Sequence, residues 1–430
     1  ISSVTAGWGT YLNATEDDSV GTVTVVTSGA EDNQEVYVAF DNGDNYTGLV
    51  SNNSTSVTFA TGILNALTDG DNYTLRTNVS DAAGNAATVN TGTSFKYDRT
   101  PPSISAVAIT GEDGIQNNFL NLGDNVSVTV TFSENSPVTG TPQLTLAVGS
   151  DNQTATYVSS GNGGTTLVFT YTIQTGDNDT NGISISANAI ALNSGTIRDL
   201  AGNNATLTHS AVSDNNSYMV DTEAPRVDNF TLSDTALKIG DNATVNLEFS
   251  EVVIEFIAAD ITNPNGSLPS MTSSNNITWT GTFTPTANTE VASNSFSLGS
   301  SSYTDLAGNA GPLATTANYE VETRAPTVSS VEITRGTGMQ NNFLNASDAA
   351  GGDVLTLSVI FRESVIIDNA SGNPTLTLAV GDDNQTATYT SGDNSTTLVF
   401  QYTIRAGDTD TNGISIGANA LALNNSTIRD

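Results

Sequence analysis

The sequence contains no cysteine, a single histidine and few basic residues. Of its 430 residues, only His209 is a histidine, and 11 are Lys or Arg against 45 Asp or Glu, which gives a formal net charge of −34. Without cysteine there is neither a disulfide framework nor a thiolate metal site. Without a basic surface, binding to nucleic acid or to anionic lipid is not expected.

The same scarcity argues against an enzyme. A Ser-His-Asp triad would have to use His209, and a multi-histidine metal site is excluded. No nucleophile elbow, phosphate loop or zinc-binding helix motif is present. Paired carboxylates could hydrolyse sugars, but a pair carries little information among 45 acidic residues. We therefore predict a non-enzymatic protein in which His209 has a structural or surface position.

The chain also lacks an apolar run of membrane-spanning length and any segment that resembles a signal peptide. Apolar residues still make up 37% of the sequence, which is sufficient for hydrophobic cores. A chain of this length suits roughly three to four domains of about 100 residues each. We expect a soluble extracellular segment with an acidic surface and no membrane insertion.

One part of the sequence occurs twice. Residues 106–199 return between residues 330 and 430, and the second copy ends at Asp430, whereas the first continues to Val220. Four segments match closely: residues 116–121 and 340–345, 144–149 and 376–381, 151–157 and 383–389, and 181–185 and 412–416. Such a repeat indicates an array of modules, in which function lies in length and stacking more often than in one pocket.

Three proline-bearing linkers divide the chain, at residues 98–102, 221–225 and 322–326. Proline fixes φ and disfavours helix in the preceding residue, so each linker is expected to be a short, stiff, extended joint. The first and third modules are shorter, and the second and fourth are the matched long pair, the fourth without its last strand. The predicted first to fourth modules are residues 1–97, 98–221, 222–323 and 324–430.

Apolar and polar residues alternate along much of each module. Leu167, Phe169, Tyr171 and Ile173 fall on one face of a strand, and residues 126–132 and 398–404 show the same period of two. Alternation in Val- and Thr-rich runs bounded by Gly, Asn and Asp is typical of half-buried antiparallel strands. Strand signals recur about every ten residues without convincing amphipathic helices, which predicts an all-β protein of β-sandwiches.

The sequence Asp-x-Ala-Gly-Asn precedes each linker, at residues 81–85, 199–203 and 305–309. Gly and Asn tolerate positive φ and Asp bonds local amides, so this pattern predicts a turn that leads into the last strand. The chain resembles the tandem immunoglobulin-like modules of large bacterial surface proteins and adhesins in three features. These are this turn pattern, the Asp-Thr-x-Ala-Pro-like linker that follows it, and residues 249–253 and 282–286. The resemblance covers all four modules. It implies an elongated array of immunoglobulin-like antiparallel β-sandwiches with an extracellular, stalk-like or matrix role.

Two loops share the pattern Asp-x-Asp-x-Asn-Gly, which ends at Gly182 and Gly413. Alternate oxygen ligands before a glycine match the first half of a calcium loop, although Asn188 and Asn419 replace the distal glutamate. The alternative is a polar turn stabilised by its own Asp side chains. The candidate calcium ligands are Asp177, Asp179 and Asn181 in one loop and Asp408, Asp410 and Asn412 in the other.

A second cation prediction concerns the module boundaries, which carry Asp98, Asp221, Glu223 and Glu322. These residues are expected near the turn residues that open the Asp-x-Ala-Gly-Asn pattern. Calcium bound between such carboxylates would stiffen the array, because it neutralises their repulsion across each joint. The alternative is that these acidic residues are only solvated. Calcium is the one cofactor that the sequence suggests.

Asparagine is abundant, and Asn-x-Ser/Thr occurs more often than the composition predicts. This pattern is the acceptor for N-glycosylation in secreted proteins, so a glycosylated exterior is a hypothesis. The candidates in expected turns or strand edges are Asn13, Asn45, Asn72, Asn125, Asn152, Asn229, Asn242 and Asn384.

A sandwich without its last strand leaves an apolar cleft and unpaired backbone groups. Either residues outside the given sequence supply the strand, or another chain supplies it by β-addition, a head-to-tail contact that makes a fibre. We expect part of a surface rod, pilus-like filament or adhesin stalk, with copies of itself or adjoining modules as partners. The alternative is a carbohydrate- or cell-binding adhesin array with glycans as partners, although Trp8 and Trp279 fit core positions equally well.

Overall fold

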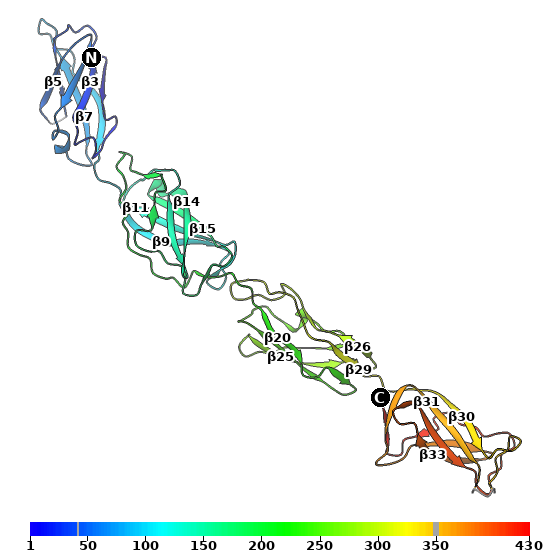
Figure 1. Ribbon diagram of the computed structural model, residues 1–430. Coiled ribbons are helices and arrows are strands. Elements are labelled where there is room, and N and C mark those ends of the chain that lie inside the picture. Colours follow the sequence, from blue (N-terminus) through cyan, green and yellow to red (C-terminus); the bar gives the residue numbers. More distant parts are fainter. Residues whose placement is uncertain (41–42, 347–351) are drawn as a thin grey trace. The chain divides into compact units, whose positions relative to one another are not determined.

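The computed structural model describes residues 1–40, 43–346 and 352–430 (Figure 1). Within these residues it consists of β-strands, turns and three short 3-10 segments, Leu64–Ala66, Asn162–Gly164 and Ala258–Asp260. The predicted all-β class is therefore confirmed. No helix in the described part of the chain is long and apolar enough to cross a membrane.

Among the residues that the structure describes, strand pairing falls into four groups, and no pairing crosses the limits expected for the modules. Contacts between residues divide the chain into two compact units. One unit holds the strands of the first two modules together with Glu251–Glu255 and Ser301–Pro312. The other holds the strands of the third and fourth modules.

The first module forms two sheets around an aromatic core. Trp8 lies against Phe59 and Phe95, with ring centroids 6.0 and 5.3 Å apart, which places this tryptophan in the core. One sheet has the order β1 (Ser3–Ala6), β3 (Gly21–Val26), β6 (Ser54–Phe59). The other has the order β2 (Tyr11–Leu12), β8 (Asn90–Tyr97), β7 (Asn72–Val79), β4 (Glu35–Ala39), β5 (Asn45–Leu49).

The second module has a six-stranded sheet and a three-stranded sheet. The six-stranded order is β17 (Ile190–Ala191), β13 (Gln143–Val148), β14 (Asp151–Gly161), β15 (Thr166–Thr172), β11 (Asn125–Phe132), β9 (Ile104–Asp113). The three-stranded order is β10 (Phe119–Leu120), β19 (Met219–Asp221), β16 (Asn178–Asp179). A separate pair joins β12 (Val138–Thr139) to β18 (Thr196–Ile197).

The predicted strand faces of the second module are confirmed by burial. Leu167, Phe169 and Ile173 are fully buried and Tyr171 nearly so, while the residues between them are more exposed. The alternating residues of β11, from Val126 to Phe132, are buried in the same cluster. Burying such side chains stabilises the fold by about 1.5–3 kcal/mol each relative to exposure.

The third module has three small sheets. The four-stranded order is β20 (Val227–Leu232), β22 (Ala243–Phe249), β25 (Thr278–Pro285), β24 (Gly266–Ser267). The other two orders are β21 (Ala236–Lys238), β29 (Tyr319–Glu322), β26 (Glu290–Asn294), and β23 (Ile261–Thr262), β27 (Ser297–Leu298), β28 (Ala314–Thr315). Trp279 is half-buried on β25, with its ring 4.9 Å from that of Phe256.

The strands of the fourth module form one sheet among the residues described. Its order is β30 (Val328–Thr337), β31 (Val354–Asp368), β34 (Ser395–Thr403), β33 (Asp383–Ser391), β32 (Thr375–Val380), β35 (Leu421–Ala422), and β36 (Thr427–Arg429) also pairs with β31. This sheet corresponds to the six-stranded sheet of the second module. The described part of the fourth module shows no counterpart of the sheet β10–β19–β16.

The Asp-x-Ala-Gly-Asn turns have the same structure in all three modules. In the second module, Asn203 donates from its backbone N and its Nδ2 to the two carboxylate oxygens of Asp199, both at 2.8 Å. The pairs Asn85–Asp81 and Asn309–Asp305 are bonded in the same way. The glycine of each turn has a φ between 85° and 97°, a backbone conformation that is strained for residues other than glycine. The predicted turn is thus confirmed.

Candidate cation centres at the module ends

Three trios of carboxylates recur along the chain. In each trio, one ligand atom per residue lies within 4.8 Å of the others. Carboxylate oxygens are the ligands that calcium prefers in proteins. The first to third trios are Asp98–Glu134–Asp199, Asp221–Glu251–Asp305 and Glu322–Glu363–Asp430.

The same elements supply each trio. The first member stands at the end of a module's last strand: Asp98 follows β8, and Asp221 and Glu322 end β19 and β29. The second member is the Glu of a Phe-x-Glu sequence at the end of β11 or β22 or within β31. The third is the Asp that opens the turn pattern, and Asp430 occupies that position in the fourth module.

Three of the four boundary residues named from the sequence, Asp98, Asp221 and Glu322, are members of the trios, and cation binding by them stays a prediction. Asp98 and Asp221 do lie near Asp199 and Asp305, but Glu223 is in no trio; it is exposed, and its backbone N donates to Asp221 Oδ1 at 3.0 Å. The glutamates Glu134, Glu251 and Glu363 were missed. Their signal in the sequence is the threefold Phe-x-Glu, at residues 132–134, 249–251 and 361–363.

Each trio contains one carboxyl whose pKa is raised. Burial is the largest cause in all three cases, and repulsion from at least one other member of the trio adds to it. The pKa of Glu134 is raised by burial and then by repulsion from Asp98 and Asp199. The pKa of Asp221 is raised by burial and then by repulsion from Asp305 and Glu223. Burial and then Asp430 and Glu322 raise the pKa of Glu363. Crowded carboxylates of this kind favour either a proton or a bound cation.

The first trio already has a positive neighbour. Lys96 Nζ lies 2.8 Å from Asp98 Oδ2, and its charge opposes the rise in the pKa of Glu134. Met219 occupies the matching position before Asp221 in the second trio.

Hydrogen bonds tie the first trio to the loop that follows β2. Asn13 Nδ2 donates to Ala201 O at 2.9 Å, and the backbone N of Ala14 donates to Asn203 Oδ1 at 3.0 Å. Asn203 Nδ2 also donates to Asp98 O at 2.7 Å. The turn of the second module is thus fastened both to the first module and to the linker between them.

The second trio repeats this arrangement. Asn121 Nδ2 donates to Ala307 O at 2.8 Å and Asn117 Nδ2 to Leu306 O at 2.9 Å. Asn309 Nδ2 donates to Asp221 O at 3.0 Å. The residues on either side of β10 therefore hold the turn of the third module, as the loop after β2 holds the turn of the second module.

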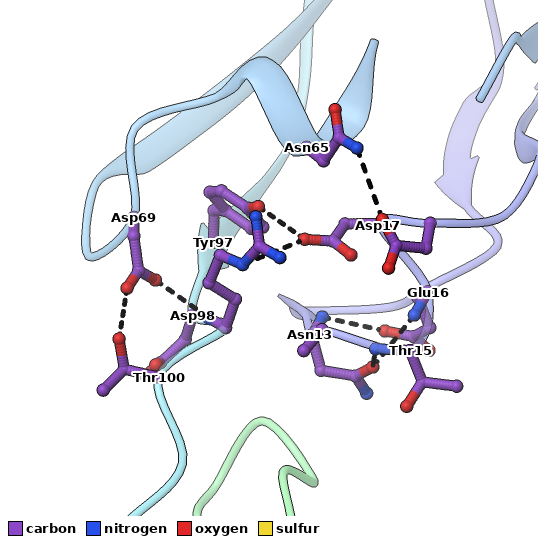
Figure 2. Close-up of polar contacts among 12 residues, drawn as sticks. Asn13, Thr15, Glu16, Asp17, Asn65, Asp69, Tyr97, Asp98 and Thr100 are labelled. Carbon is purple, nitrogen blue, oxygen red and sulfur yellow. Dashed lines mark hydrogen bonds and ion pairs between the residues drawn. The ribbon is translucent and has the colours of Figure 1, made fainter. Parts of the chain in front are cut away.

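The first linker is also fixed to the first module (Figure 2). Asp69 accepts hydrogen bonds from the backbone N of Arg99, at 2.8 Å, and from the hydroxyl of Thr100. Asp17, which is fully buried, accepts from the hydroxyl of Tyr97 at 2.5 Å and lies 3.6 Å from Arg99 Nε. Burial and then Asp17 raise the pKa of Tyr97 to about 12.

The Asp-x-Asp-x-Asn-Gly loop of the second module uses its carboxylates as hydrogen-bond acceptors. Asp179 accepts from the backbone N of Gly149 at 2.7 Å, and from those of Asn181 and Gly182 at 3.2 and 2.7 Å. Asp177 accepts from the Tyr171 hydroxyl at 2.6 Å. This geometry favours the polar turn, while calcium in this loop stays a prediction.

The matching loop of the fourth module is built in the same way. Asp410 accepts from the backbone N of Gly413 at 2.8 Å and of Asn412 at 3.1 Å, and Asp408 accepts from the Tyr402 hydroxyl at 2.6 Å. Hydrogen bonds from backbone N–H groups lower the pKa of Asp410. Neither loop shares a residue with the trios.

The predicted glycosylation sites differ in accessibility. Asn13 is half-buried and uses its Nδ2 in the contact with Ala201, so a glycan there would break that contact. Asn125 is half-buried and accepts from Thr172 Oγ1. The remaining six are exposed: Asn45, Asn72, Asn152, Asn229, Asn242 and Asn384.

His209 has a structural position. Its Nε2 accepts a hydrogen bond from the backbone N of Ala189 at 2.9 Å, and its Nδ1 lies 2.8 Å from Ser210 O. With Nε2 as acceptor, the neutral ring donates from Nδ1. Both nitrogens are thereby engaged with the backbone.

Comparison with known proteins bears on the fold. Residues 221–321 match the family model of a bacterial Ig-like domain, which confirms the resemblance noted in the sequence and the immunoglobulin-like fold class. No curated protein matches the chain.

Several solved structures are similar at low identity. One is from a study of host cell surface retention of a 1.5-MDa bacterial ice-binding adhesin: 17% identity, 73% of this chain, 94% of the other, TM-score 0.37. A tetra-tandem repeat from the extending region of a large adhesion protein has 14% identity, 100% and 99% coverage and a TM-score of 0.25. FdeC, an adhesin of Escherichia coli, has 11% identity, 72% and 93% coverage and a TM-score of 0.21.

Proposed function

We propose that this chain is a structural part of an extracellular adhesin-type surface protein, in which calcium at the three trios stiffens successive joints. Its role is mechanical: sandwich modules set the length, and short proline linkers limit bending. The chain would form part of a stalk, rod or pilus-like filament. No step of this role requires catalysis.

The recurrence of the trio carries this proposal. Three separate sets of strands bring a linker acid, a Phe-x-Glu glutamate and a turn Asp within 4.8 Å. Because each set includes a linker residue, a divalent cation would bind the linker to the module that follows it. Neutralising three close carboxylates also removes the repulsion that raises the pKa of one member in each trio.

Small-angle scattering and thermal unfolding of the full chain in calcium and after chelation test the proposal. Calcium is expected to increase the radius of gyration and to raise the midpoint temperature of unfolding. At a free calcium concentration of 100 times Kd, binding at one site stabilises the folded chain by about 2.7 kcal/mol. Unchanged length and midpoint would rule out calcium at the trios.

A matched pair of variants assigns the response to the trios. Glu363→Gln removes one ligand and one repelling charge, so it should weaken the calcium response without lowering stability in chelator. Asp382→Asn removes an exposed carboxylate in the turn between β32 and β33 and should leave the response intact. An equal loss in both variants would indicate general screening of the acidic surface.

Head-to-tail assembly by strand complementation is the second part of this proposal. Electron microscopy of concentrated protein checks it, since regular fibres are expected. Saturable binding of the chain on a glycan array, with no fibres, would instead favour a carbohydrate-binding adhesin array.

A further inference from the structure

The two Asp-x-Asp-x-Asn-Gly loops each end in a residue pair that deamidates readily. The pairs are Asn181–Gly182 in the second module and Asn412–Gly413 in the fourth. The glycines have a φ of 94° and 102°, a backbone conformation that is strained for other residues, so each loop needs its glycine. Glycine also leaves the preceding asparagine open to attack, because it has no side chain that obstructs the reaction.

Deamidation starts at the backbone nitrogen of the glycine. This nitrogen loses its proton and attacks the side-chain carbonyl carbon of the asparagine, the bond from that carbon to the amide nitrogen breaks, and ammonia leaves with the proton. Water then opens the cyclic imide at one of its two carbonyl groups, which gives aspartate or isoaspartate. A group that holds the N–H of the glycine and opposes negative charge on its nitrogen therefore slows the reaction.

A carboxylate oxygen holds this N–H group in both loops. Gly182 N donates to Asp179 Oδ1 at 2.7 Å. Gly413 N donates to Asp410 Oδ1 at 2.8 Å. The same oxygen accepts from the backbone N of the asparagine, at 3.2 Å in the second module and 3.1 Å in the fourth. Because a hydrogen bond to an ionised acceptor is roughly twice as strong as a neutral one, the attacking nitrogen is firmly held.

Deamidation in the second module would disturb its surroundings. Asn181 Nδ2 donates to Asp214 Oδ2 at 2.6 Å, so the reaction would replace this donor by a carboxylate next to another carboxylate. Asp179 also belongs to β16, in which Asn178 pairs with Asp221 of the second trio. An altered backbone at Asn181 would therefore lie two residues from a strand that pairs with the linker acid.

We infer that the asparagines of both loops are deamidation sites, which Asp179 and Asp410 keep intact. The carboxylate retains the N–H proton of the glycine, and its charge opposes the amide anion that must form before the ring closes. The fold needs an Asn-Gly turn at this place, and the aspartate two residues before the asparagine offsets the lability of that turn. The inference goes beyond the proposed function and does not depend on it, because neither loop shares a residue with the trios.

Peptide mapping by mass spectrometry, after incubation of the full chain in mildly alkaline buffer, tests the inference. In Asp410→Ala, deamidation of Asn412 should be roughly tenfold to a hundredfold faster than in the parent chain, because a hydrogen bond to a charged acceptor is lost. Asn265–Gly266 in the third module is the internal reference, whose rate should be equal in both chains. An unchanged rate at Asn412 in folded Asp410→Ala would overturn the inference.

A conservative variant separates the hydrogen bond from the charge. Asp410→Asn keeps an oxygen acceptor without its charge, so its rate at Asn412 should lie between those of the parent chain and Asp410→Ala. Asp382→Asn is the matched control, since it removes an exposed carboxylate in the turn between β32 and β33 and leaves the acceptor of Gly413 in place. Equal acceleration in Asp382→Asn and Asp410→Asn would assign the protection to overall charge and overturn the role of Asp410.

Loss of the fold would also accelerate deamidation. Asn394–Ser395, where the turn after β33 meets β34, reports such a loss within the same module. Acceleration at Asn412 alone supports the inference. If Asp410→Ala accelerates both sites and lowers the midpoint temperature of unfolding, the milder Asp410→Asn decides the question.

The second module supplies the reciprocal experiment. Asp179→Asn should accelerate deamidation at Asn181 and leave Asn412 at the parental rate, because each carboxylate holds only the glycine of its own loop. Asp410→Asn should do the reverse. Acceleration of both asparagines by either variant would overturn a local protective role of these two aspartates.

Discussion

The second and fourth modules share most of their strand sequence but differ in how completely they cover their cores. Both bury the same face of matched strands, including Phe169 and Phe400. The second adds the sheet β10–β19–β16, which covers Leu120 and Ile183. In the second module the smaller sheet therefore completes the burial of one end of the core.

The largest expected effect comes from making the second module resemble the fourth. Val220→Asp places a charge at a fully buried position in β19, so we expect a loss of about 4 kcal/mol and release of that strand. Hydrogen exchange of the β10 and β16 amides and denaturant unfolding measure the change. Val158→Asp, at a 55% exposed position of β14, should cost less than about 0.5 kcal/mol; a similar loss in both would contradict the comparison.

A second test compares the two Tyr–Asp pairs. Asp177 is 6% exposed, and Asp408 is half-buried, although both accept a 2.6 Å bond from a tyrosine. Asp177→Asn should therefore cost about 2 kcal/mol and Asp408→Asn about 1 kcal/mol, because water replaces part of the interaction in the fourth module. Chemical denaturation of each variant gives the two values, and equal costs would show that the greater exposure of Asp408 does not weaken its bond with Tyr402.

A third test removes the hydrogen bonds that Asn203 makes in the turn of the second module. Asn203 is nearly buried and bonds both Asp199 and the carbonyl of Asp98, so Asn203→Ala should cost about 1.5 kcal/mol. Asn85→Ala, in the more exposed turn of the first module, should cost about 0.5 kcal/mol. Thermal unfolding measures both, and the reverse order would remove the fastening role of Asn203.

The smallest effect is a loss of stability in alkali. Burial and then Asp408 raise the pKa of Tyr402 from 10.0 to about 12. Below pH 10 the hydroxyl is neutral in the folded and unfolded states; between pH 10 and 12 only the unfolded state ionises, so stability falls as pH rises. The fall is at most about 1.4 kcal/mol per pH unit for this group. Unfolding at pH 9 and 11 should show a smaller difference in Tyr402→Phe, and an unchanged difference would argue against this residue.

The sequence predicted the features that depend on near neighbours. The alternation from Leu167 to Ile173 predicted a buried strand face, and Asp199, Gly202 and Asn203 predicted a turn, because a strand has a period of two and the turn closes within five residues. It did not distinguish a calcium loop from a polar turn at Asp177, since both require the same residues. The tertiary contact with Gly149 favours the turn.

The trios show where reasoning from sequence stopped. The linker acids were found from their position, but Glu134 lies 36 residues from Asp98 along the chain and meets it only through the pairing of β9 with β11 and of β11 with β15. A glutamate after a strand is common on any surface. Only the recurrence of Phe-x-Glu in three modules could have marked it.

The sequence by itself determined the all-β class, the repeat, the linkers and the turns, because periodicity and local backbone preferences act over a few residues. Tertiary structure alone decided which carboxylates meet and which Asp oxygens accept backbone N–H groups. These outcomes depend on strand register, and register brings together residues whose separation in the sequence carries no local signal.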